Sequence, residues 1–455
     1  MRRHTLLLSA SAFLLSLASF AVTPIDPVAI MAEFDHISAT PLWRGFDPQQ
    51  VPIEIYDGRQ TWLFRHPHPP EGFVESPQHK GVFLFSGMHP SVRANSSTQL
   101  GGAETATAVL DKRSGRSDHE LAALAMHEAF HVFERQHHPN WQANEADFFM
   151  YPVDNFSLLQ YRFAETESLR RALLARDVNE SACWAAEALR FRNRRFGGLD
   201  AVATAFERGT ELNEGLATYI QVRAAGSASS FSLPQNDFAA EAVRDRAYKV
   251  GAALALLLDR IANGWQAELN AGASNSLDEL LAAKTYFAAP TCSFSDTENA
   301  SLLARARSAV TALKDRRAQF KADFSAAKGK QLIISSSTPL QVEGFDPSNL
   351  VELGNGELLH RRWIKLKVQD GDIEVLDRAA LTEPAGKHPL MDGVREITVS
   401  GIPDNPKIVP NGDSVEITCD GVHASFKHAN IRTVGEKTLV QIEPDPAANP
   451  GTPSH

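Results

Sequence analysis

Three patterns of hydrophobic and polar residues follow one another along the chain. In residues 22–116, short alternating runs are separated by Pro and Gly, and the Asp57-Gly58 pair between two of them predicts a hairpin, so a small β-sheet is expected. In residues 117–328, apolar residues recur at helical spacing, which predicts a mainly α-helical body. In residues 329–443, short β-type runs and turn dipeptides return, which predicts a C-terminal all-β, sandwich-like domain. The expected class is α+β.

The two ends of the chain differ from these three parts. Residues 1–21 combine a basic start, an apolar run and small residues, a pattern typical of an export signal cleaved after Ala21. Residues 444–455 are rich in Pro, Ala and Gly, which predicts a disordered tail. The later apolar run Gly251–Leu258 is too short to cross a bilayer. We therefore expect a secreted or periplasmic protein with no membrane span after cleavage.

Composition and charge exclude some classes of protein. The 455 residues are 43% hydrophobic and 22% charged, which is ordinary for a globular chain. The formal net charge is -10, so the chain lacks the basic field that nucleic-acid binding requires. No nucleic-acid partner is expected, and the composition gives no indication of the oligomeric state.

Three cysteines follow the signal segment. An exported chain meets an oxidising compartment, so Cys183 and Cys292, both in the helical body, are candidates for a disulfide. Cys419 lies in a strand-like run and is expected to be a buried small hydrophobic residue. No CxxC pair is present, so the sequence supports neither a thiolate zinc site nor a thioredoxin-type redox role.

One long helix is predicted directly after the N-terminal sheet. Ser117 and Glu120 have the spacing of a capping box, which predicts the start of this helix. Pro139 predicts its end. About twenty residues between them should therefore form a single helix.

This helix contains the pattern H-E-x-x-H. At 100° per residue, His127 and His131 lie only about 40° apart on adjacent turns, so both imidazoles can bind one zinc ion. Glu128 is rotated about a quarter turn away, where it can reach a zinc-activated water without binding the metal. The pattern therefore predicts two metal ligands and a general base.

A catalytic zinc site generally takes three protein ligands, so one more is needed. The best candidate is Glu214, in the segment Thr210–Gln221, whose apolar residues repeat at helical spacing and would pack against the motif helix. Gly215 beside it removes a side chain where the two helices approach closely. A carboxylate at this position would complete a set of two histidines and one glutamate.

Together, the H-E-x-x-H pattern at 127–131 and the run Asn213-Glu214-Gly215-x-Ala217-x-Tyr219 resemble the gluzincin superfamily of zinc metallopeptidases. That group includes the thermolysin-like enzymes and many zinc aminopeptidases, and the resemblance covers these two helices. It implies a zincin-like catalytic unit built from the N-terminal sheet and the helical body, with Zn²⁺ as cofactor and Glu214 as the third ligand. The 82 residues between His131 and Glu214 imply an inserted helical section at about 140–206.

Alternatives for the third ligand remain open. His137 stands at the spacing of the metzincin pattern, although Glu134 replaces the glycine of that pattern. Glu211 lies one helical turn before Glu214; its other expected roles are to hold a ligating imidazole or to be a solvated carboxylate. Two further candidates, which follow the motif helix, are Glu145 and Asp147.

The resemblance also indicates other parts of the site. Gluzincin-like sites use a Tyr or His donor to stabilise the oxyanion, and Tyr248, at the head of an apolar helix, is the candidate; simple packing is the alternative. Leu100–Leu110 alternates like an edge strand just before the motif helix. In zincins such a strand receives the substrate backbone by β-augmentation, and an ordinary sheet edge is the alternative.

The sequence therefore predicts an exported zinc-dependent metallopeptidase. It would hydrolyse peptide bonds of a peptide or protein substrate through a zinc-activated water, with Glu128 as general base. A competing class is a non-catalytic extracellular binding protein with structural zinc, in which the C-terminal domain recognises the ligand. Another is a zinc hydrolase of a non-peptide amide. The sequence indicates neither the preferred substrate sequence nor endo- versus exopeptidase action.

Overall fold

The computed structural model describes residues 25–443, apart from 93, 111–114, 273–275, 286–291, 370 and 413. The chain divides into two compact units, which are described one at a time. The N-terminal unit takes in the chain up to Gln136 together with Arg223–Ala225. The C-terminal unit takes in His137–Val222 and the chain from Gly226 onward.

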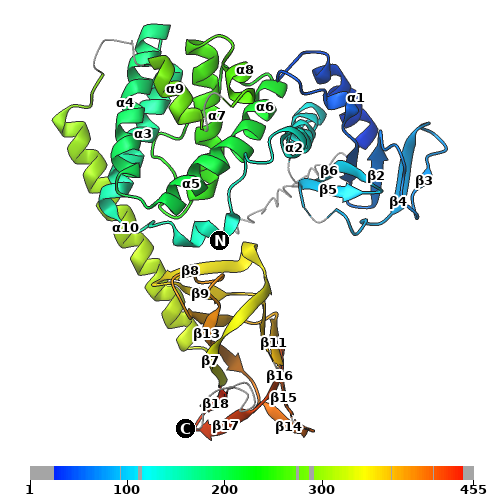
Figure 1. The fold of residues 1–455 in the computed structure, drawn as a ribbon, viewed down its shortest axis with the longest axis vertical. Helices are drawn as coiled ribbons and strands as arrows, with labels where there is room; N and C mark the ends of the chain where they lie inside the picture. The colour runs from blue at the N-terminus through cyan, green and yellow to red at the C-terminus, as the bar shows by residue number, and fades with distance from the viewer. Residues whose placement is uncertain are drawn as a thin grey trace, which may run out of the picture. The chain divides into compact units, whose positions relative to one another are not determined.

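The fold is of the mixed α+β class, as the sequence predicts. Over the described residues, ten α-helices accompany a small N-terminal sheet and a large, mostly antiparallel C-terminal sheet (Figure 1). Most of the helices lie in the stretch of chain between the two sheets. The predicted export signal, residues 1–21, and the predicted tail, residues 444–455, lie outside the described residues.

The N-terminal unit contains a six-stranded sheet with the order β3-β4-β2-β1-β6-β5. Strand β6 runs parallel to β1, and the other neighbours are antiparallel. Its elements are α1 (Pro27–Ser38), η1 (Pro48–Gln50), β1 (Ile53–Tyr56), β2 (Gln60–Phe64), β3 (Val74–Glu75), β4 (Val82–Ser86), β5 (Ser96–Leu100), β6 (Ala103–Val109) and α2 (Asp118–His137). The sequence pattern before residue 117 predicts only a sheet, and α1 is a helix that this prediction does not include. Its start has a local cause, because Asp26 caps it and Pro27 occupies its first turn.

The predicted hairpin at Asp57-Gly58 is confirmed. Strands β1 and β2 pair antiparallel on either side of it. The Asp57 carboxylate accepts hydrogen bonds from the backbone amides of Arg59 and Gln60, at 2.8 and 2.9 Å. Gly58 has a φ of 91°, which a side chain would disfavour. The turn residues therefore fix the hairpin locally.

The prediction of one edge strand over Leu100–Leu110 is wrong. Gly101 and Gly102 have φ values of 51° and 83°, so the chain turns there and β5 and β6 form a hairpin. Strand β6 is covered on both sides by β1 and β5, and the edge of the sheet is β5. A strand is correct for β6, although residues 105–108 are all buried and do not alternate, and the two glycines in the left-handed region end β5 just before it.

The predicted motif helix is confirmed as α2. The Glu120 amide donates to the Ser117 hydroxyl, and the Ser117 amide donates to the Glu120 carboxylate, so both bonds of the capping box are present. The helix ends at His137, two residues before Pro139. Its boundaries are therefore set by the residues that predicted them.

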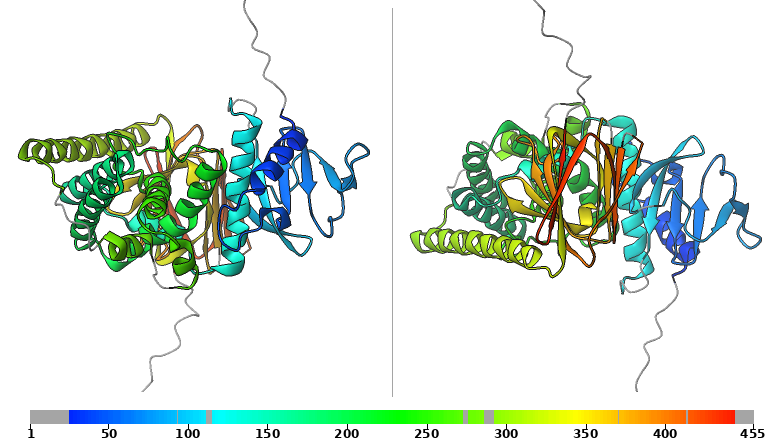
Figure 2. Two further views of the ribbon diagram at one scale, coloured as in Figure 1. Left: turned by 90° about the horizontal axis from the view of Figure 1, so that it is seen from above. Right: turned by 90° about the horizontal axis from the view of Figure 1, so that it is seen from below.

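The helices after α2 form the body that the sequence predicts. They are η3 (Glu145–Met150), α3 (Phe156–Leu174), α4 (Val178–Phe196), α5 (Ala201–Thr210), η4 (Glu211–Gly215), α6 (Leu216–Ala224), α7 (Val243–Ile261), α8 (Trp265–Asn270), α9 (Leu277–Thr285) and α10 (Asp296–Ser325). The expected inserted section at 140–206 contains α3, α4 and the start of α5. Helix α10 is a single helix of 30 residues that packs against α3 (Figures 1 and 2). It also contacts β8 of the C-terminal sheet. Across the described residues, no helix has both the length and the apolar character of a membrane span.

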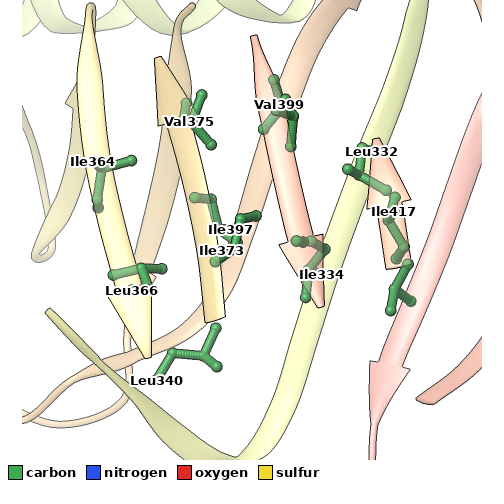
Figure 3. Packing of buried hydrophobic residues seen from close by; sticks show 14 of the residues in the cluster. Leu332, Ile334, Leu340, Ile364, Leu366, Ile373, Val375, Ile397, Val399 and Ile417 are labelled. Atoms are coloured by element: carbon green, nitrogen blue, oxygen red, sulfur yellow. The ribbon is translucent and has the colours of Figure 1, made fainter. Parts of the chain in front are cut away.

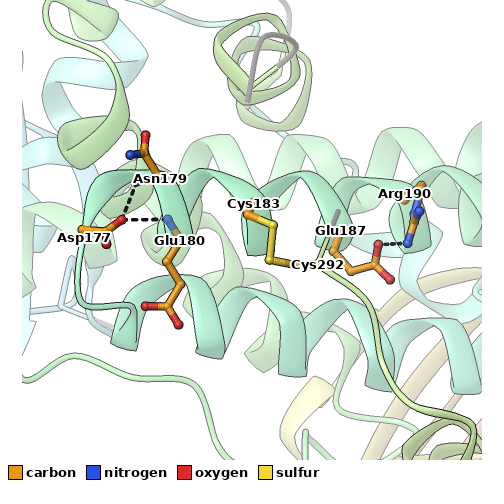
Figure 4. Close-up of a disulfide and its surroundings, with 7 residues drawn as sticks. All are labelled: Asp177, Asn179, Glu180, Cys183, Glu187, Arg190 and Cys292. Atoms are coloured by element: carbon orange, nitrogen blue, oxygen red, sulfur yellow. Dashed lines mark hydrogen bonds and ion pairs between the residues drawn. A yellow bond between two sulfur atoms is a disulfide. The ribbon is translucent and has the colours of Figure 1, made fainter. Parts of the chain in front are cut away.

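A disulfide links two distant parts of the helical body. Cys183 of α4 is bonded to Cys292, 109 positions later and just before α10 (Figure 4). The sequence indicates these two cysteines only as candidates for a disulfide, and the structure joins them. Cys419 is a free, half-buried thiol in β15 that packs against the core of the C-terminal sheet.

The C-terminal sheet has twelve strands, and β7 connects its two halves. The first part of β7 pairs with β13 and β18, and its last residues pair with β10. The strands are β7 (Lys330–Phe345), β8 (Leu350–Gly354), β9 (Glu357–His360), β10 (Trp363–Val368), β11 (Gly371–Leu376), β12 (Ala380–Pro384), β13 (Val394–Ile402), β14 (Lys407–Asn411), β15 (Ser414–Cys419), β16 (Val422–Lys427), β17 (Ala429–Val434) and β18 (Lys437–Ile442). Aliphatic side chains from both halves form one core, because alternate residues of each strand face it (Figure 3).

Candidate metal centre

Helix α2 brings two histidines of the N-terminal unit together. His127 and His131 lie on adjacent turns, and both are buried, with 7% and 8% of their surface exposed. Their Nε2 atoms are 3.1 Å apart. The four-residue spacing therefore brings the two imidazoles together as predicted, because the Nε2 atoms of both rings face each other.

The separation of these nitrogens fits a single zinc ion. Zinc–imidazole bonds are about 2.0–2.1 Å long, so two nitrogens 3.1 Å apart subtend roughly 100° at a shared ion. That angle is close to the tetrahedral value that zinc prefers. The two imidazole nitrogens are therefore spaced correctly to bind one zinc ion.

Glu134 orients one of the two imidazoles. Its carboxylate lies 2.8 Å from Nδ1 of His131 and is itself buried. When Nδ1 carries the proton and donates it to Glu134, Nε2 presents its lone pair to a metal. In the sequence, Glu134 stands out only as the residue that replaces the glycine of the metzincin pattern. Its spacing of three residues from His131 on a helix was the signal that could have identified it.

Glu128 is the third member of the cluster on α2. A carboxylate oxygen of Glu128 and one nitrogen of each histidine all lie within 4.8 Å of one another. The side chain is buried, with 4% of the residue exposed. At this range a carboxylate can accept a proton from a water molecule held between it and the imidazoles.

Aromatic packing holds α2 in place within the N-terminal unit. Phe130, next to His131 in the sequence, is fully buried and makes edge-to-face contacts with Trp43 and Phe46. Phe133 adds a contact with Phe46 on the following turn. Rigid packing of this face limits the rotation of α2 and hence the freedom of both histidines.

In the C-terminal unit, Glu214 lies on a π-helical turn. Helix α5, η4 and α6 follow one another without a gap, and η4 (Glu211–Gly215) is wound more loosely than its neighbours. The expected apolar face is buried, and its Tyr219 contacts Trp265 of α8. π-turns of this kind are rare and occur frequently at functional sites.

Two glycines allow η4 to cross α7 at very short range. A Cβ atom on Gly215 would lie 2.6 Å from Cα of Gly251, and a Cβ on Gly251 would lie 2.5 Å from the carbonyl oxygen of Glu211. The sequence predicts that Gly215 permits a close approach to the motif helix. The helix that requires this glycine is α7, because only another glycine leaves room for it.

The structure brings Glu214 and Tyr248 together. The Tyr248 hydroxyl forms a hydrogen bond with the Glu214 carboxylate. Arg244 lies one turn earlier on α7. Its guanidinium nitrogens are 3.5 Å from a carboxylate oxygen of Glu214 and 2.9 Å from one of Glu145. Its Cζ atom is 5.0 Å from the centre of the Tyr248 ring. Two residues that the sequence placed in one site therefore belong to one cluster with an arginine that the sequence did not identify.

Burial and neighbouring charges shift the ionisation of this cluster. Burial first, and then the negative charge of Glu214, raise the pKa of Tyr248 above its ordinary value, so its hydroxyl keeps its proton. Burial and the charge of Glu214 also raise the pKa of Glu145, while Arg244 opposes that shift. Tyr248 is thus a hydrogen-bond donor at neutral pH.

Glu211, an alternative third ligand, is held by an arginine. Its two oxygens accept hydrogen bonds of 2.7 and 2.6 Å from Arg192 of α4, and both side chains are buried. This contact favours the role of a structural carboxylate over that of a metal ligand. The expected alternative role of Glu211 as a solvated carboxylate is wrong, because this side chain is buried and bound to Arg192.

The Arg192–Glu211 pair belongs to a larger buried ion network. Arg195 and Arg246 both contact Glu165 and Glu207, at 2.6–2.9 Å, so three arginines balance three glutamates. Burial opposes ionisation, but Arg192 and Arg195 still lower the pKa of Glu165 to about 2. Helical periodicity does not reveal such a network, because its members come from five separate elements.

The other alternative ligands are accounted for as follows. Helix α2 continues as far as His137, so Glu134 does not end it as the glycine of the metzincin pattern would. Six residues of helix place His137 about 120° around the axis from His131. Asp147 accepts a hydrogen bond of 2.9 Å from Asn144, and Glu145 pairs with Arg244.

Within their own units, the described residues thus form two groups: His127, Glu128, His131 and Glu134 on α2, and Glu214, Tyr248, Arg244 and Glu145 around η4. Comparison of the chain with protein-family models, with curated protein sequences and with solved structures finds no match. Evidence about function therefore comes from the chemistry of these two groups.

Proposed function

We propose that the protein is a zinc-dependent hydrolase of peptide bonds. The observation that carries this proposal is the pair of buried Nε2 atoms 3.1 Å apart, with a carboxylate of Glu128 within 4.8 Å. A buried pair of imidazoles on one helix face, one of them oriented by Glu134, has the chemistry of a zinc site.

Three residues would hold the ion: His127, His131 and Glu214. Support for Glu214 comes from the π-turn that carries it, from its contact with Tyr248, and from the resemblance to gluzincins stated above. The alternative Glu211 already uses both oxygens to bind Arg192. When bound, zinc would supply Lewis-acid polarisation of the scissile carbonyl and a lowered pKa for a water molecule.

Glu128 would act as the general base. Its carboxylate accepts a proton from the water whose oxygen attacks the carbonyl carbon, and it then delivers that proton to the nitrogen of the leaving amine as the C–N bond breaks. Its burial supports this role, because a desolvated carboxylate is a stronger base than a hydrated one.

Tyr248 would stabilise the negative charge that develops on the carbonyl oxygen. Support comes from its contact with Glu214 and from its raised pKa, which keeps the hydroxyl protonated and able to donate. A donor beside the third ligand would be near the reacting carbonyl. Loss of one such donor typically lowers kcat by about 10²–10³-fold.

We also propose that the protein acts outside the cytoplasm, as a secreted or periplasmic enzyme on peptide or protein substrates. The Cys183–Cys292 disulfide supports this location, because such bonds persist mainly in oxidising compartments.

The proposal is tested by zinc analysis and casein-type peptide hydrolysis on the purified full-length chain. The wild-type protein should bind one zinc ion and lose hydrolysis reversibly on chelation. Glu128→Gln should retain zinc and lose hydrolysis by about 10²–10⁴-fold, while His131→Ala should lose zinc. His137→Ala serves as the control on the same helix and should retain both.

Other outcomes separate the competing classes. Unchanged zinc content in His131→Ala would refute the ligand assignment. Stoichiometric zinc without hydrolysis of any peptide would indicate a non-catalytic zinc-containing binding protein. Hydrolysis of N-acyl amides but not peptides would indicate a hydrolase of non-peptide amides.

A further inference from the structure

A cavity of about 360 Å³ lies inside the C-terminal unit, between η3, α10 and β8. We call it the η3 cavity. Phe148 and Phe149 of η3, Phe320 and Leu313 of α10, and Val351 of β8 form its apolar walls. The volume is within the range of roughly 300–1,000 Å³ that is usual for small-molecule sites.

The walls of the η3 cavity are apolar but incompletely covered. None of the six residues of η3 is buried, although three of them, Phe148, Phe149 and Met150, are large and apolar. Large side chains of this kind normally become buried during folding because water is excluded from their surface. Here a cavity remains beside the phenylalanines, so an additional apolar group could cover them.

The charged side chains at the η3 cavity neutralise one another. Arg316 pairs with Glu241, and Arg317 pairs with Glu352. The Arg317 side chain is held further by a bond of 3.1 Å from Nε to the Glu352 carbonyl oxygen. Arg317 also lies 3.6 Å from a carboxylate oxygen of Asp154, so both arginines are already paired with carboxylates and neither is left to attract an anionic ligand; the walls therefore favour an uncharged apolar molecule.

The cavity is connected to the candidate site through η3. Glu145, the first residue of η3, pairs with Arg244, which lies 3.5 Å from Glu214. Tyr151, directly after η3, lines the cavity, and its hydroxyl donates a hydrogen bond of 2.8 Å to Glu207 of the ion network. The same short segment therefore contacts the cavity, the network and the partner of Glu214.

We propose that the η3 cavity binds a small, neutral, apolar molecule with one or two rings, and that this molecule fixes η3. The aromatic walls match such rings, and the volume matches their size. A bound molecule restricts the segment that positions Glu145. The site is independent of the proposed hydrolase function, because binding requires neither zinc nor turnover.

The test uses the full-length protein and 6-propionyl-2-(dimethylamino)naphthalene, a neutral probe with two fused aromatic rings whose fluorescence rises in apolar surroundings. Wild-type protein should bind one probe per chain, with saturation. Val351→Trp should lower the affinity at least tenfold because the larger side chain fills the cavity. Val434→Trp is the matched control: Val434 is 60% exposed, does not line the cavity, and should leave binding unchanged.

A second variant and a second measurement keep the test decisive. Phe149→Ala removes one aromatic wall and should also weaken binding at least tenfold, whether or not Val351→Trp folds. In wild-type protein the saturating probe should slow amide hydrogen exchange of residues 145–153 and leave β14 and β15 unchanged. Absence of saturable binding, equal affinity in the folded cavity variants, or no change in exchange at 145–153 would overturn the proposal.

Discussion

Glu134 shows how a single buried carboxylate can determine the chemistry of a histidine. It lies 2.8 Å from Nδ1 of His131, so Nε2 is left to face His127. We expect Glu134→Gln to weaken zinc binding by about 10–100-fold, because an amide stabilises the ligating form of the imidazole less well. Competition with a chromogenic chelator measures the zinc affinity.

The control for Glu134→Gln is Glu33→Gln, which changes a half-buried carboxylate of the same unit that pairs with His119, at the other end of α2 from Glu134. This variant should bind zinc like the wild type. Equal zinc affinity in Glu134→Gln and wild type would show that Glu134 does not orient the ligand.

Glu54 provides a second prediction at the scale of one residue. It is fully buried in β1 and accepts hydrogen bonds of 2.9 and 2.8 Å from the Ser91 hydroxyl. Burial raises its pKa from 4.5 to about 7, although the bond from Ser91 opposes the shift. Nδ1 of His89 lies 3.2 Å from a carboxylate oxygen of Glu54; this residue is half-buried, and its partial burial lowers the pKa of the imidazole.

The folded N-terminal unit therefore keeps a proton on Glu54 that the unfolded chain releases between pH 4.5 and 7. Its contribution to stability is complete below pH 4.5 and falls by roughly 3 kcal/mol as the pH rises to 7. His89 has the opposite effect on stability. Because its pKa is lowered in the folded state, its contribution to the free energy of unfolding is lost as the pH falls. The difference between Glu54→Gln and wild type isolates the carboxyl.

Amide hydrogen exchange of β1 and β2 between pH 5 and 8 measures this effect. The opening free energy of wild-type protein, relative to that of Glu54→Gln, should decrease as the pH rises. Glu71→Gln, at an exposed position in the same unit, should follow the wild type. Parallel curves for Glu54→Gln and wild type would contradict the prediction.

At the scale of the elements, the crossing of η4 and α7 is the most constrained contact near Glu214. Gly215 and Gly251 face each other, and a Cβ on Gly251 would lie 2.5 Å from the Glu211 carbonyl oxygen. We expect Gly251→Ala to lower the free energy of unfolding by roughly 1–3 kcal/mol, because the backbones must separate. If Glu214 binds zinc, the same variant should also weaken zinc binding.

Urea denaturation and zinc titration measure the two effects of Gly251→Ala. Gly197→Ala makes the same substitution at an exposed position where the added Cβ would come no closer than 3.3 Å to another atom. It should change stability by less than about 1 kcal/mol. If Gly251→Ala were as stable as the wild type, the backbones of η4 and α7 could move apart without loss of stability, and the prediction would be wrong.

At the scale of the whole molecule, one covalent bond connects distant parts of the C-terminal unit. The Cys183–Cys292 disulfide closes a loop with a sequence separation of 109 residues. Replacing both cysteines by serine should lower the free energy of unfolding by roughly 3–5 kcal/mol, because the unfolded chain regains conformational freedom. Urea denaturation of the double variant measures this loss, and Cys419→Ser is the control with no disulfide to break.

Reduction gives an independent check on the disulfide. A reducing agent should shift the wild-type unfolding transition toward that of the double variant and leave the double variant unchanged. An unaltered wild-type transition after complete reduction would mean that the bond does not stabilise the unit.

Elements whose interactions are local were predicted from the sequence alone. The capping box at Ser117, the turn at Asp57-Gly58 and the facing of His127 and His131 each depend on residues within one or two turns of one another. Hydrophobic spacing was sufficient for the helical body and for the β-rich parts on either side. In contrast, alternation over Leu100–Leu110 does not reveal that Gly101 and Gly102 form a turn between β5 and β6.

The contacts around Glu214 were decided by the tertiary structure. Glu211 is bound by Arg192, nineteen residues earlier, and Gly215 faces Gly251 across two helices. Such pairs have no fixed spacing in the sequence, because each partner is supplied by a different element. The sequence thus determined which side chains can perform acid–base and metal chemistry, and it determined the local geometry of two imidazoles. Only packing between elements decided which carboxylates are already bound to arginines, because burial requires each charge to have a partner.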